Sequence, residues 1–288
     1  MSVRKFLLPV SSPASAEGAL QTGLMLAKRW QAHLQVLHIR NGQEFAPFVG
    51  EGMTGAMIED MMSASERATG ARARSLAELF AMAAEAAAVP VGEAMRGRDE
   101  PSASFTTLSG REDELIAHKA RLADLTIVPH PQAGEDVAAA DALHAVLFDS
   151  GRPVLLAPVI PPASFGKRIA IAWNGTANSA SALASVMPFV RQAEAVRILV
   201  SDDYRRPGPS GAEVAEYISH HGVTADVVPF YPRRGVTGAG LLAAAADFGA
   251  DLMSMGAYST ASRLRQLILG GITRHVLENA QLPVMMNR

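Results

Sequence analysis

The sequence repeats itself at long range, and this repetition constrains the fold more than any other feature. The matching segments are Ala123-Asp124-Leu125 with Ala250-Asp251-Leu252, Arg152-Pro153-Val154 with Leu282-Pro283-Val284, and Arg4-Lys5 with Lys167-Arg168. Each pair stands at the same relative place beside a short apolar segment. The sequence therefore predicts an internal duplication of one α/β unit.

Length and composition fit two units of ordinary size. The chain has 288 residues, of which 49% are hydrophobic, enough for two cores of about 100–150 residues each. A segment rich in proline, residues 158–166, has no helical or strand periodicity and reads as a stiff linker. We predict a first unit at residues 1–158, a linker at 159–166 and a second unit at 167–288.

Composition also excludes several classes of function. The net charge of −2 provides no long-range attraction for nucleic acid or an anionic membrane. The absence of cysteine excludes disulfides, thiolate chemistry and zinc–cysteine sites, and it fits a reducing compartment. The apolar run within the first ten residues is too short for a signal peptide. No run in the sequence approaches the roughly 20 apolar residues of a membrane span. We expect a soluble, cytoplasmic protein.

Strand and helix patterns alternate along both halves of the chain. Strands are expected at 5–10, 33–40, 102–107, 125–128 and 154–157, and again at 168–173, 195–201, 225–229, 252–255 and 284–286. Helices are expected at 16–30, 112–119, 137–148, 179–190, 212–221, 237–248 and 272–280, with two more in 54–88, separated near Gly70. Because β and α segments alternate, each unit should contain a five-stranded, mainly parallel sheet.

Methionines cluster at the start of the long helical stretch, at Met53, Met57, Met61 and Met62. Methionine at helical spacing is typical of core or interface packing rather than of a cofactor site. We interpret this cluster as a subunit contact and expect a homodimer.

A glycine-rich stretch near the carboxyl terminus carries the strongest functional signal. The apolar run Leu252 to Met255 ends at Gly256, and a polar, basic loop leads to Gly270-Gly271, where helical spacing begins with Ile272. Glycines at a helix amino terminus let a ligand oxygen approach free backbone N–H groups, and the helix dipole favours negative charge there. The stretch therefore predicts a phosphate-binding turn.

This pattern resembles the signature of the universal stress protein family, in which Gly-x-x-Gly, nine residues and Gly-Gly or Gly-Ser hold the phosphates and ribose of ATP or AMP. Here Gly256 opens the motif, Ser259 stands at the second glycine, and ten residues separate it from Gly270; counting from Thr260 restores nine. The resemblance extends over nearly the whole chain as a tandem pair of units.

The resemblance implies two flavodoxin-like, doubly wound units that pair through their last strands, with a nucleotide at the carboxyl ends of the strands of the second unit. Trp173, Asn174, Gly175 and Thr176 would meet ribose and phosphates, and Leu199 and Val200 would lie against adenine. The glycine loop would add Gly256, Ser259, Thr260, Arg263, Gly270, Gly271 and Ile272.

The first unit departs from this pattern. After its fourth strand, residues 128–134 lead almost directly into a helix, without the basic loop and without Gly-Gly. Proline at 129 and 131 cannot donate an N–H group to a phosphate. We interpret the first unit as a packing partner that binds no nucleotide, and His130 as a solvated loop residue.

No other motif points to chemistry. The histidines show neither H-E-x-x-H nor i, i+4 pairing, and the chain contains no G-x-S-x-G and no phosphate-loop lysine motif. We expect no metal and no enzyme activity. Three functions stay open: a stress-response regulatory protein that binds ATP or AMP and acts through a protein partner, a ligand-free scaffold or protein-interaction module of the same fold, and a weak ATPase.

Overall fold

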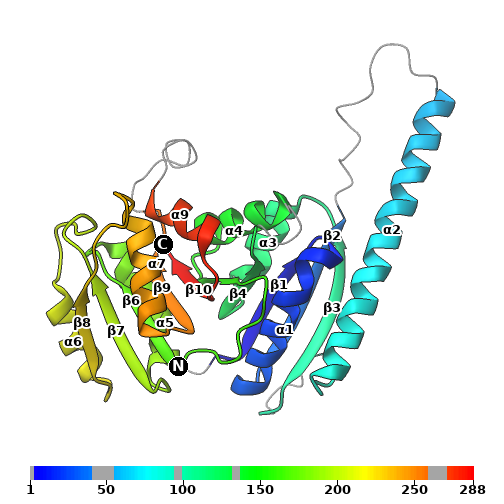
Figure 1. Cartoon of the computed structure of the whole chain (residues 1–288). Helices are drawn as coiled ribbons and strands as arrows, with labels where there is room; N and C mark the ends of the chain where they lie inside the picture. Colours follow the sequence, from blue (N-terminus) through cyan, green and yellow to red (C-terminus); the bar gives the residue numbers. More distant parts are fainter. Residues whose placement is uncertain (1–2, 41–54, 94–98, 132–136, 259–270) are drawn as a thin grey trace.

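The computed structural model describes residues 3–40, 55–93, 99–131, 137–258 and 271–288, and Figure 1 shows their arrangement. We call residues 3–157 the amino half and residues 167–288 the carboxyl half. The amino half contains β1 (Lys5–Val10), α1 (Pro13–Trp30), β2 (His33–Arg40), α2 (Gly55–Ala86), β3 (Ser102–Ser109), α3 (Glu112–Ala120), β4 (Leu125–Pro129), α4 (Val137–Asp149) and β5 (Val154–Ala157). The carboxyl half contains β6 (Arg168–Ala172), α5 (Ala177–Val190), β7 (Ala195–Val200), α6 (Gly211–Ser219), β8 (Ala225–Pro229), α7 (Thr237–Phe248), β9 (Leu252–Gly256), α9 (Ile272–Asn279) and β10 (Val284–Asn287).

All ten strands belong to one sheet, in the order β3-β2-β1-β4-β5-β10-β9-β6-β7-β8. Neighbouring strands are parallel within each half, whereas β5 and β10 pair antiparallel at the centre, with Val284 opposite Leu156 and Met286 opposite Val154. Read from the outer edge to the centre of the sheet, the strand order is β3-β2-β1-β4-β5 in the amino half and β8-β7-β6-β9-β10 in the carboxyl half, which is the same order of equivalent strands. This arrangement confirms the predicted α/β fold with a five-stranded parallel array in each half.

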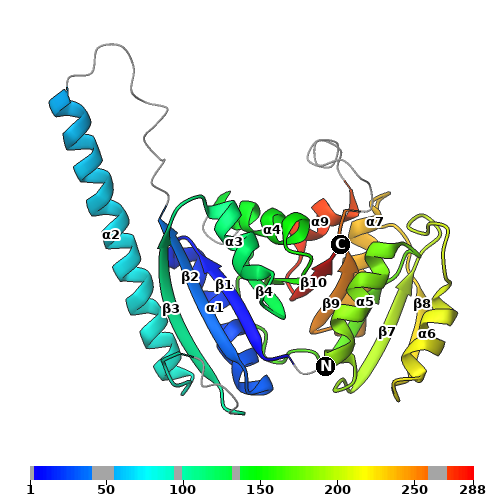
Figure 2. The ribbon, with the colours of Figure 1, turned by 180° about the vertical axis from the view of Figure 1, so that it is seen from behind.

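Helices cover both faces of the sheet, and each face has its own apolar core (Figures 1 and 2). One core joins α1, α2, α5 and α6 to the strands through buried residues such as Leu20, Phe80 and Val186. The other joins α3, α4, α7 and α9 through residues such as Val146 and Leu241. Strand residues alternate between the two cores because successive side chains point to opposite faces, so the strands read as continuous apolar runs.

The internal repeat extends to individual hydrogen bonds. The carboxylate of Asp124 accepts the backbone N–H groups of residues 4 and 5, at 2.8 and 3.0 Å, and so fixes the start of β1. The carboxylate of Asp251 accepts those of residues 167 and 168, at 3.1 and 2.8 Å, at the start of β6. The aspartate of each repeated Ala-Asp-Leu segment therefore makes the same pair of hydrogen bonds, to the backbone at the start of the first strand of its half.

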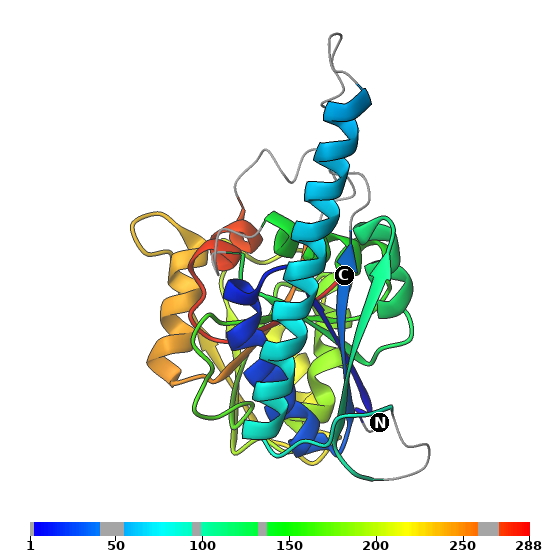
Figure 3. The ribbon, with the colours of Figure 1, turned by 90° about the vertical axis from the view of Figure 1, so that its right-hand side faces the viewer.

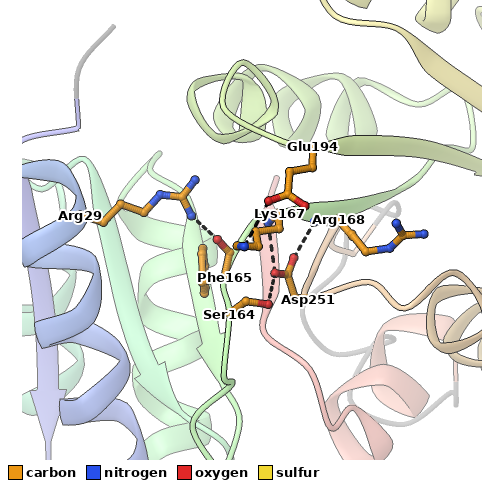
Figure 4. Close-up of polar contacts among 7 residues, drawn as sticks. All are labelled: Arg29, Ser164, Phe165, Lys167, Arg168, Glu194 and Asp251. Carbon is orange, nitrogen blue, oxygen red and sulfur yellow. Dashed lines mark hydrogen bonds and ion pairs between the residues drawn. The ribbon is translucent and has the colours of Figure 1, made fainter.

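The segment between the halves is packed against both of them (Figure 4). The Ser164 hydroxyl donates to Asp251 at 2.6 Å, and the Arg29 guanidinium of α1 donates to the carbonyl of Phe165. The Phe165 side chain is 3% exposed, and its ring lies 5.7 Å from that of Phe189. Residues 164–165 are thus held by the amino half and the carboxyl half at once.

Helix α2 is continuous where the sequence predicted a break. We expected two helices separated near Gly70, but Gly55–Ala86 is a single helix of 32 residues. A glycine inside a helix costs only about 1 kcal/mol relative to alanine, and the alanines and arginines that follow Gly70 favour helix. Its amino-terminal part rises beyond the sheet and the other helices (Figure 3). No helix among the described residues is long and apolar enough to span a membrane.

We predict that Asp251→Ala lowers the free energy of unfolding by about 2–3 kcal/mol, because it removes a charged acceptor of two backbone N–H groups and one hydroxyl. Urea denaturation followed by circular dichroism measures this change. The control is Asp247→Ala, which removes an exposed ion pair with Arg233 and should change stability by less than about 0.5 kcal/mol. Equal effects of the two variants would contradict the role given to Asp251.

Candidate functional site

Two loops meet at the carboxyl ends of β6 and β7. The Trp173 indole N–H, just after β6, donates to the carbonyl of Pro209 at 2.8 Å. The backbone N–H of Arg206 donates to the carbonyl of Asn174, also at 2.8 Å. The loop after β7, residues 201–210, is therefore fastened onto the loop after β6.

Glycine is required where these loops touch. Gly175 has φ +85°, and a Cβ atom there would lie 2.8 Å from the carbonyl oxygen of Arg206. A Cβ atom on Gly208 would lie 2.0 Å from the carbonyl oxygen of Gly175. These distances are too short for any side chain, so the two glycines allow the backbones to come into direct contact.

Asn174 and Thr176 organise the start of α5. The Asn174 side-chain oxygen accepts hydrogen bonds from the Thr176 N–H at 3.2 Å and from its hydroxyl at 2.8 Å. The Thr176 side chain in turn accepts the N–H of Ser179 at 3.3 Å and so caps the helix. Among the described residues, the Asn174 amide NH₂ makes no hydrogen bond, so this buried side chain keeps a free donor.

A cavity of about 260 Å³ opens beside these loops, at the carboxyl ends of β6, β7 and β8. We call it the edge cavity. It is lined by Trp173, Asn174, Val200, Ser201, Asp202, Arg205, Pro209, Ser210, Gly211, Pro229, Phe230 and Tyr231. Aromatic and aliphatic groups form its walls, and hydroxyl, amide and charged groups are placed among them, a mixture that suits a flat heterocycle.

The two residues expected beside adenine lie on opposite faces of β7. Val200 lines the edge cavity. Leu199 is fully buried in the core on the other face of the sheet. Successive strand residues point to opposite faces, so only one of the two side chains can reach a ligand in this cavity.

The end of β9 packs tightly against the start of α5. A Cβ atom on Gly256 would lie 2.6 Å from the backbone nitrogen of Ser179, so this glycine permits the close approach of strand and helix. The Asn178 amide donates to the carbonyls of Ala257 and Tyr258, at 2.7 and 2.9 Å. The first residues of the glycine loop are therefore anchored to α5.

Tyr258 joins this loop to the amino half. Its hydroxyl lies 3.0 Å from Nε2 of His144 on α4, and its ring lies 5.3 Å from that of Phe148. Burial raises the pKa of the Tyr258 phenol, so the hydroxyl stays protonated near neutral pH. Neither His144 nor Phe148 was among the residues that the sequence pattern singled out.

A second cavity, of about 360 Å³, lies between the amino termini of α7 and α9, and we call it the helix cavity. It is lined by Gly235, Val236, Thr237, Gly238, Gly271, Ile272, Arg274, His275 and Glu278. Neither helix has a side-chain cap: the N-cap residues are Val236 and Gly271. A Cβ atom on Gly271 would meet no atom of the described residues within 4 Å, so these residues leave the backbone at the start of α9 open.

The predicted site residues thus separate into groups. Trp173, Asn174 and Val200 line the edge cavity, and Gly271 and Ile272 line the helix cavity. Gly175, Thr176, Leu199 and Gly256 have packing or capping roles and line neither. Ser259, Thr260, Arg263 and Gly270 lie outside the described residues.

Sequence reasoning missed two residues that line the edge cavity, Phe230 and Tyr231. Their signal was their position directly after the strand Ala225–Pro229, because the carboxyl ends of parallel strands share one edge of a sheet. Ser210 was detectable too: it is followed by Glu213, and the two form a complete capping box at the start of α6.

The amino half differs at the equivalent position. Strand pairing places Lys5 opposite His33 as it places Arg168 opposite Ala195, so five residues farther along His38 corresponds to Val200. The His38 side chain is buried, and its Nδ1 lies 3.0 Å from the carbonyl oxygen of Val10. Burial lowers the pKa of this imidazole, and it is neutral at physiological pH. His130, expected to be solvated, is also buried, at 3% exposure.

In the part of the chain that the structure describes, no three histidine, aspartate or glutamate residues are grouped so that they could hold a metal ion.

Comparison with known proteins bears on the fold. No protein-family model and no curated protein matches this sequence. Among solved structures, a universal stress protein from Archaeoglobus fulgidus DSM 4304 is similar over 100% of this chain and 99% of its own, with a TM-score of 0.66 and 16% identity. UspA of Lactobacillus plantarum is similar over 55% of this chain and 99% of its own, with a TM-score of 0.40 and 17% identity. A universal stress protein in complex with cAMP is similar over 55% and 99%, with a TM-score of 0.32 and 15% identity.

The full-length similarity shows that this chain has the fold of a universal stress protein from end to end. The resemblance predicted from the glycine loop and the internal repeat is therefore confirmed at the level of fold.

Tyr204 provides a pH test of the loop beside the edge cavity. Burial raises the pKa of its phenol to about 12, against about 10 in the unfolded chain. Because the folded state holds the proton more tightly, its contribution to stability is complete below pH 10 and is lost as pH rises from about 10 to 12. We predict a loss of about 2–3 kcal/mol over that interval, measured by urea denaturation, and a smaller loss in Tyr204→Phe. Identical pH profiles would contradict burial of this phenol.

Proposed function

We propose that the carboxyl half binds an adenine nucleotide, ATP or AMP, and that the protein is a regulatory protein of the stress-response type. The observation that carries this proposal is the pair of cavities along the carboxyl edge of β6 to β9, one suited to a base and the other to phosphate. In open α/β sheets ligands bind at this edge, so the location is the expected one for a nucleotide.

The edge cavity would take the adenine ring. Its volume of about 260 Å³ is close to the lower limit of small-molecule pockets, which fits a base better than a whole nucleotide. Val200 and Phe230 offer apolar contact to the faces of the ring. The Asn174 amide, whose oxygen is engaged by Thr176, has its NH₂ group left to donate to a ring nitrogen or a ribose hydroxyl.

The helix cavity would take the phosphates. The first N–H groups of α7 and α9 have no side-chain acceptor at either N-cap, and both helix dipoles favour an anion between them. Arg274 lines the same cavity but is paired with Glu278 at 2.6 Å, so backbone amides rather than a side-chain cation would provide most of the attraction. Gly271 leaves room for a phosphate oxygen to approach closely.

The amino half would bind no nucleotide. His38 fills the position that corresponds to Val200, and Pro129 ends β4 without an N–H group to offer. We therefore propose a division into a first unit at 1–158, a linker at 159–166 and a second, ligand-binding unit at 167–288. The nucleotide would act as a signal, without turnover, in a cytoplasmic protein that passes the signal to a protein partner.

One alternative has specific support. Gly175, Gly208 and Gly256 are each required for packing within the protein, so these glycines need no ligand to explain them. A scaffold of this fold that binds no nucleotide would keep all three. The alternatives differ in whether isothermal titration detects binding, and a weak ATPase would in addition release phosphate.

We predict that Gly271→Glu weakens ATP binding about tenfold, because a carboxylate at the start of α9 repels the phosphates and takes up its free N–H groups. The matched control is Gly271→Gln, which has the same shape without the charge and should have a smaller effect. No atom of the described residues would lie within 4 Å of a Cβ atom at this position, so both variants should fold. Equal affinities of the two variants for ATP in isothermal titration would count against a phosphate at α9.

We predict that Val200→Trp abolishes binding of both ATP and AMP, because the indole occupies the edge cavity that both ligands share. Val159→Trp, at a site 53% exposed and remote from this cavity, is the control and should bind like the wild type. Thermal denaturation checks that both variants fold. Unchanged affinity of folded Val200→Trp, or no binding by the wild type at millimolar nucleotide, would favour the scaffold.

A further inference from the structure

The helix α2 is packed against the molecule only along its carboxyl-terminal part. Leu76, Phe80 and Ala84 are at most 3% exposed and face the sheet. Between residues 56 and 68, by contrast, every side chain that the structure describes is exposed or only partly covered. Figure 3 shows this part of the helix rising clear of the sheet and its other helices. A helix with little tertiary packing is marginal in water, and none of these side chains is buried by the residues that the structure describes.

One side of the projecting part is apolar. Met57, Met61, Ala64, Ala68 and Ala71 follow one another at intervals of four, three, four and three residues, and we call them the apolar seam. This spacing places them on one face of a helix, in the pattern that pairs helices in coiled coils. Met57 is 52% exposed, and Ala64, Ala68 and Ala71 are exposed as well.

The charges on the same part of the helix are segregated along its length. Residues 55–64 carry Glu59 and Asp60, for a net charge of −2, and residues 65–74 carry Glu66 with arginines at 67, 72 and 74, for a net charge of +2. The helix dipole does not account for this pattern, because the arginines lie in the middle of the helix and its last turn has no basic residue. The arginines at 67, 72 and 74 form no ion pair with any of the described residues.

We propose that α2 is a dimerisation helix, on which α2 of a second copy of this chain packs antiparallel along the apolar seam. The antiparallel arrangement places Met61 of one copy against Ala71 of the other and Ala64 against Ala68, so large residues meet small ones along the contact. It also brings Asp60, on one flank of the seam, next to Arg74 of the second copy. Twofold symmetry produces this charge pair twice.

The charges select a second copy in this orientation over other occupants. A parallel pair would set methionine against methionine and place Asp60 beside Asp60, with no cation near it. An anionic membrane surface would be repelled by Glu59 and Asp60, which lie at the exposed end of the helix. The antiparallel self-pair sets Asp60 against Arg74 at both ends, and it sets Arg67, midway between them, against Arg67 of the second copy. Two contacts between opposite charges thus outweigh one contact between like charges.

The test reverses these charges. We expect the wild-type mass in sedimentation velocity to be twice the chain mass of 30.4 kDa. Asp60→Arg and Arg74→Glu, each made alone, place like charges together at both ends of the pair, and each variant should sediment as a single chain. Residues 60 and 74 are about 21 Å apart on one helix, so neither substitution disturbs the other residue within the same chain.

Rescue separates pairing from misfolding. An equimolar mixture of Asp60→Arg and Arg74→Glu restores opposite charges at both ends of the antiparallel pair, and it should recover twice the chain mass. The double variant should do the same by itself. The matched control is Glu66→Arg, which makes the same change of charge on the side of the helix away from the seam and should leave the dimer intact.

Three outcomes would overturn the proposal. The first is a wild-type protein that stays at 30.4 kDa as its concentration is raised. The second is a dimer whose mass neither single reversal changes, because pairing would then occur on another surface. The third is loss of the dimer in the single variants without recovery in the mixture, with helix content by circular dichroism unchanged, because the effect would then not come from the opposed charges.

Discussion

The antiparallel pairing of β5 with β10 is the contact on which the whole molecule depends. Both strands are almost entirely buried, and their pairing joins two five-stranded arrays into one ten-stranded sheet. Without it, each half would expose a flat apolar edge strand that could pair with other chains. Because the two strands run in opposite directions, the carboxyl ends of neighbouring strands point opposite ways at the centre of the sheet. Each half must therefore build any ligand site from its own loops, and the edge cavity and the helix cavity both belong to the carboxyl half.

The candidate site is assembled by loops that hold one another in place. The Trp173 indole and the Asn174 carbonyl fasten the loop after β7, and the Asn178 amide fastens the loop after β9. A nucleotide would therefore meet edge-cavity walls already positioned by protein contacts, which reduces the entropy lost on binding. The same contacts explain why Gly175 and Gly256 can be essential to the structure whether or not a ligand is bound.

Strand positions and the internal repeat were predictable because buried parallel strands are continuous apolar runs, and because Asp124 and Asp251 repeat with their neighbours. Period-two alternation could have separated Leu199 from Val200, since one faces the core and the other the edge cavity. The break expected at Gly70 was wrong because a cost of about 1 kcal/mol does not end a helix of good helix formers. Phe230 and Tyr231 were missed because no motif marks the residues that follow an edge strand.

The central claim is that adenine lies in the edge cavity of the carboxyl half. Photolabelling with 8-azido-ATP, followed by mass spectrometry of the labelled peptides, tests it most directly because the reactive azide is attached to the base. The account predicts covalent label within residues 200–231, close to Tyr231, and loss of that label when excess AMP competes. Label confined to the amino half, or label in the carboxyl half that AMP does not displace, would contradict it.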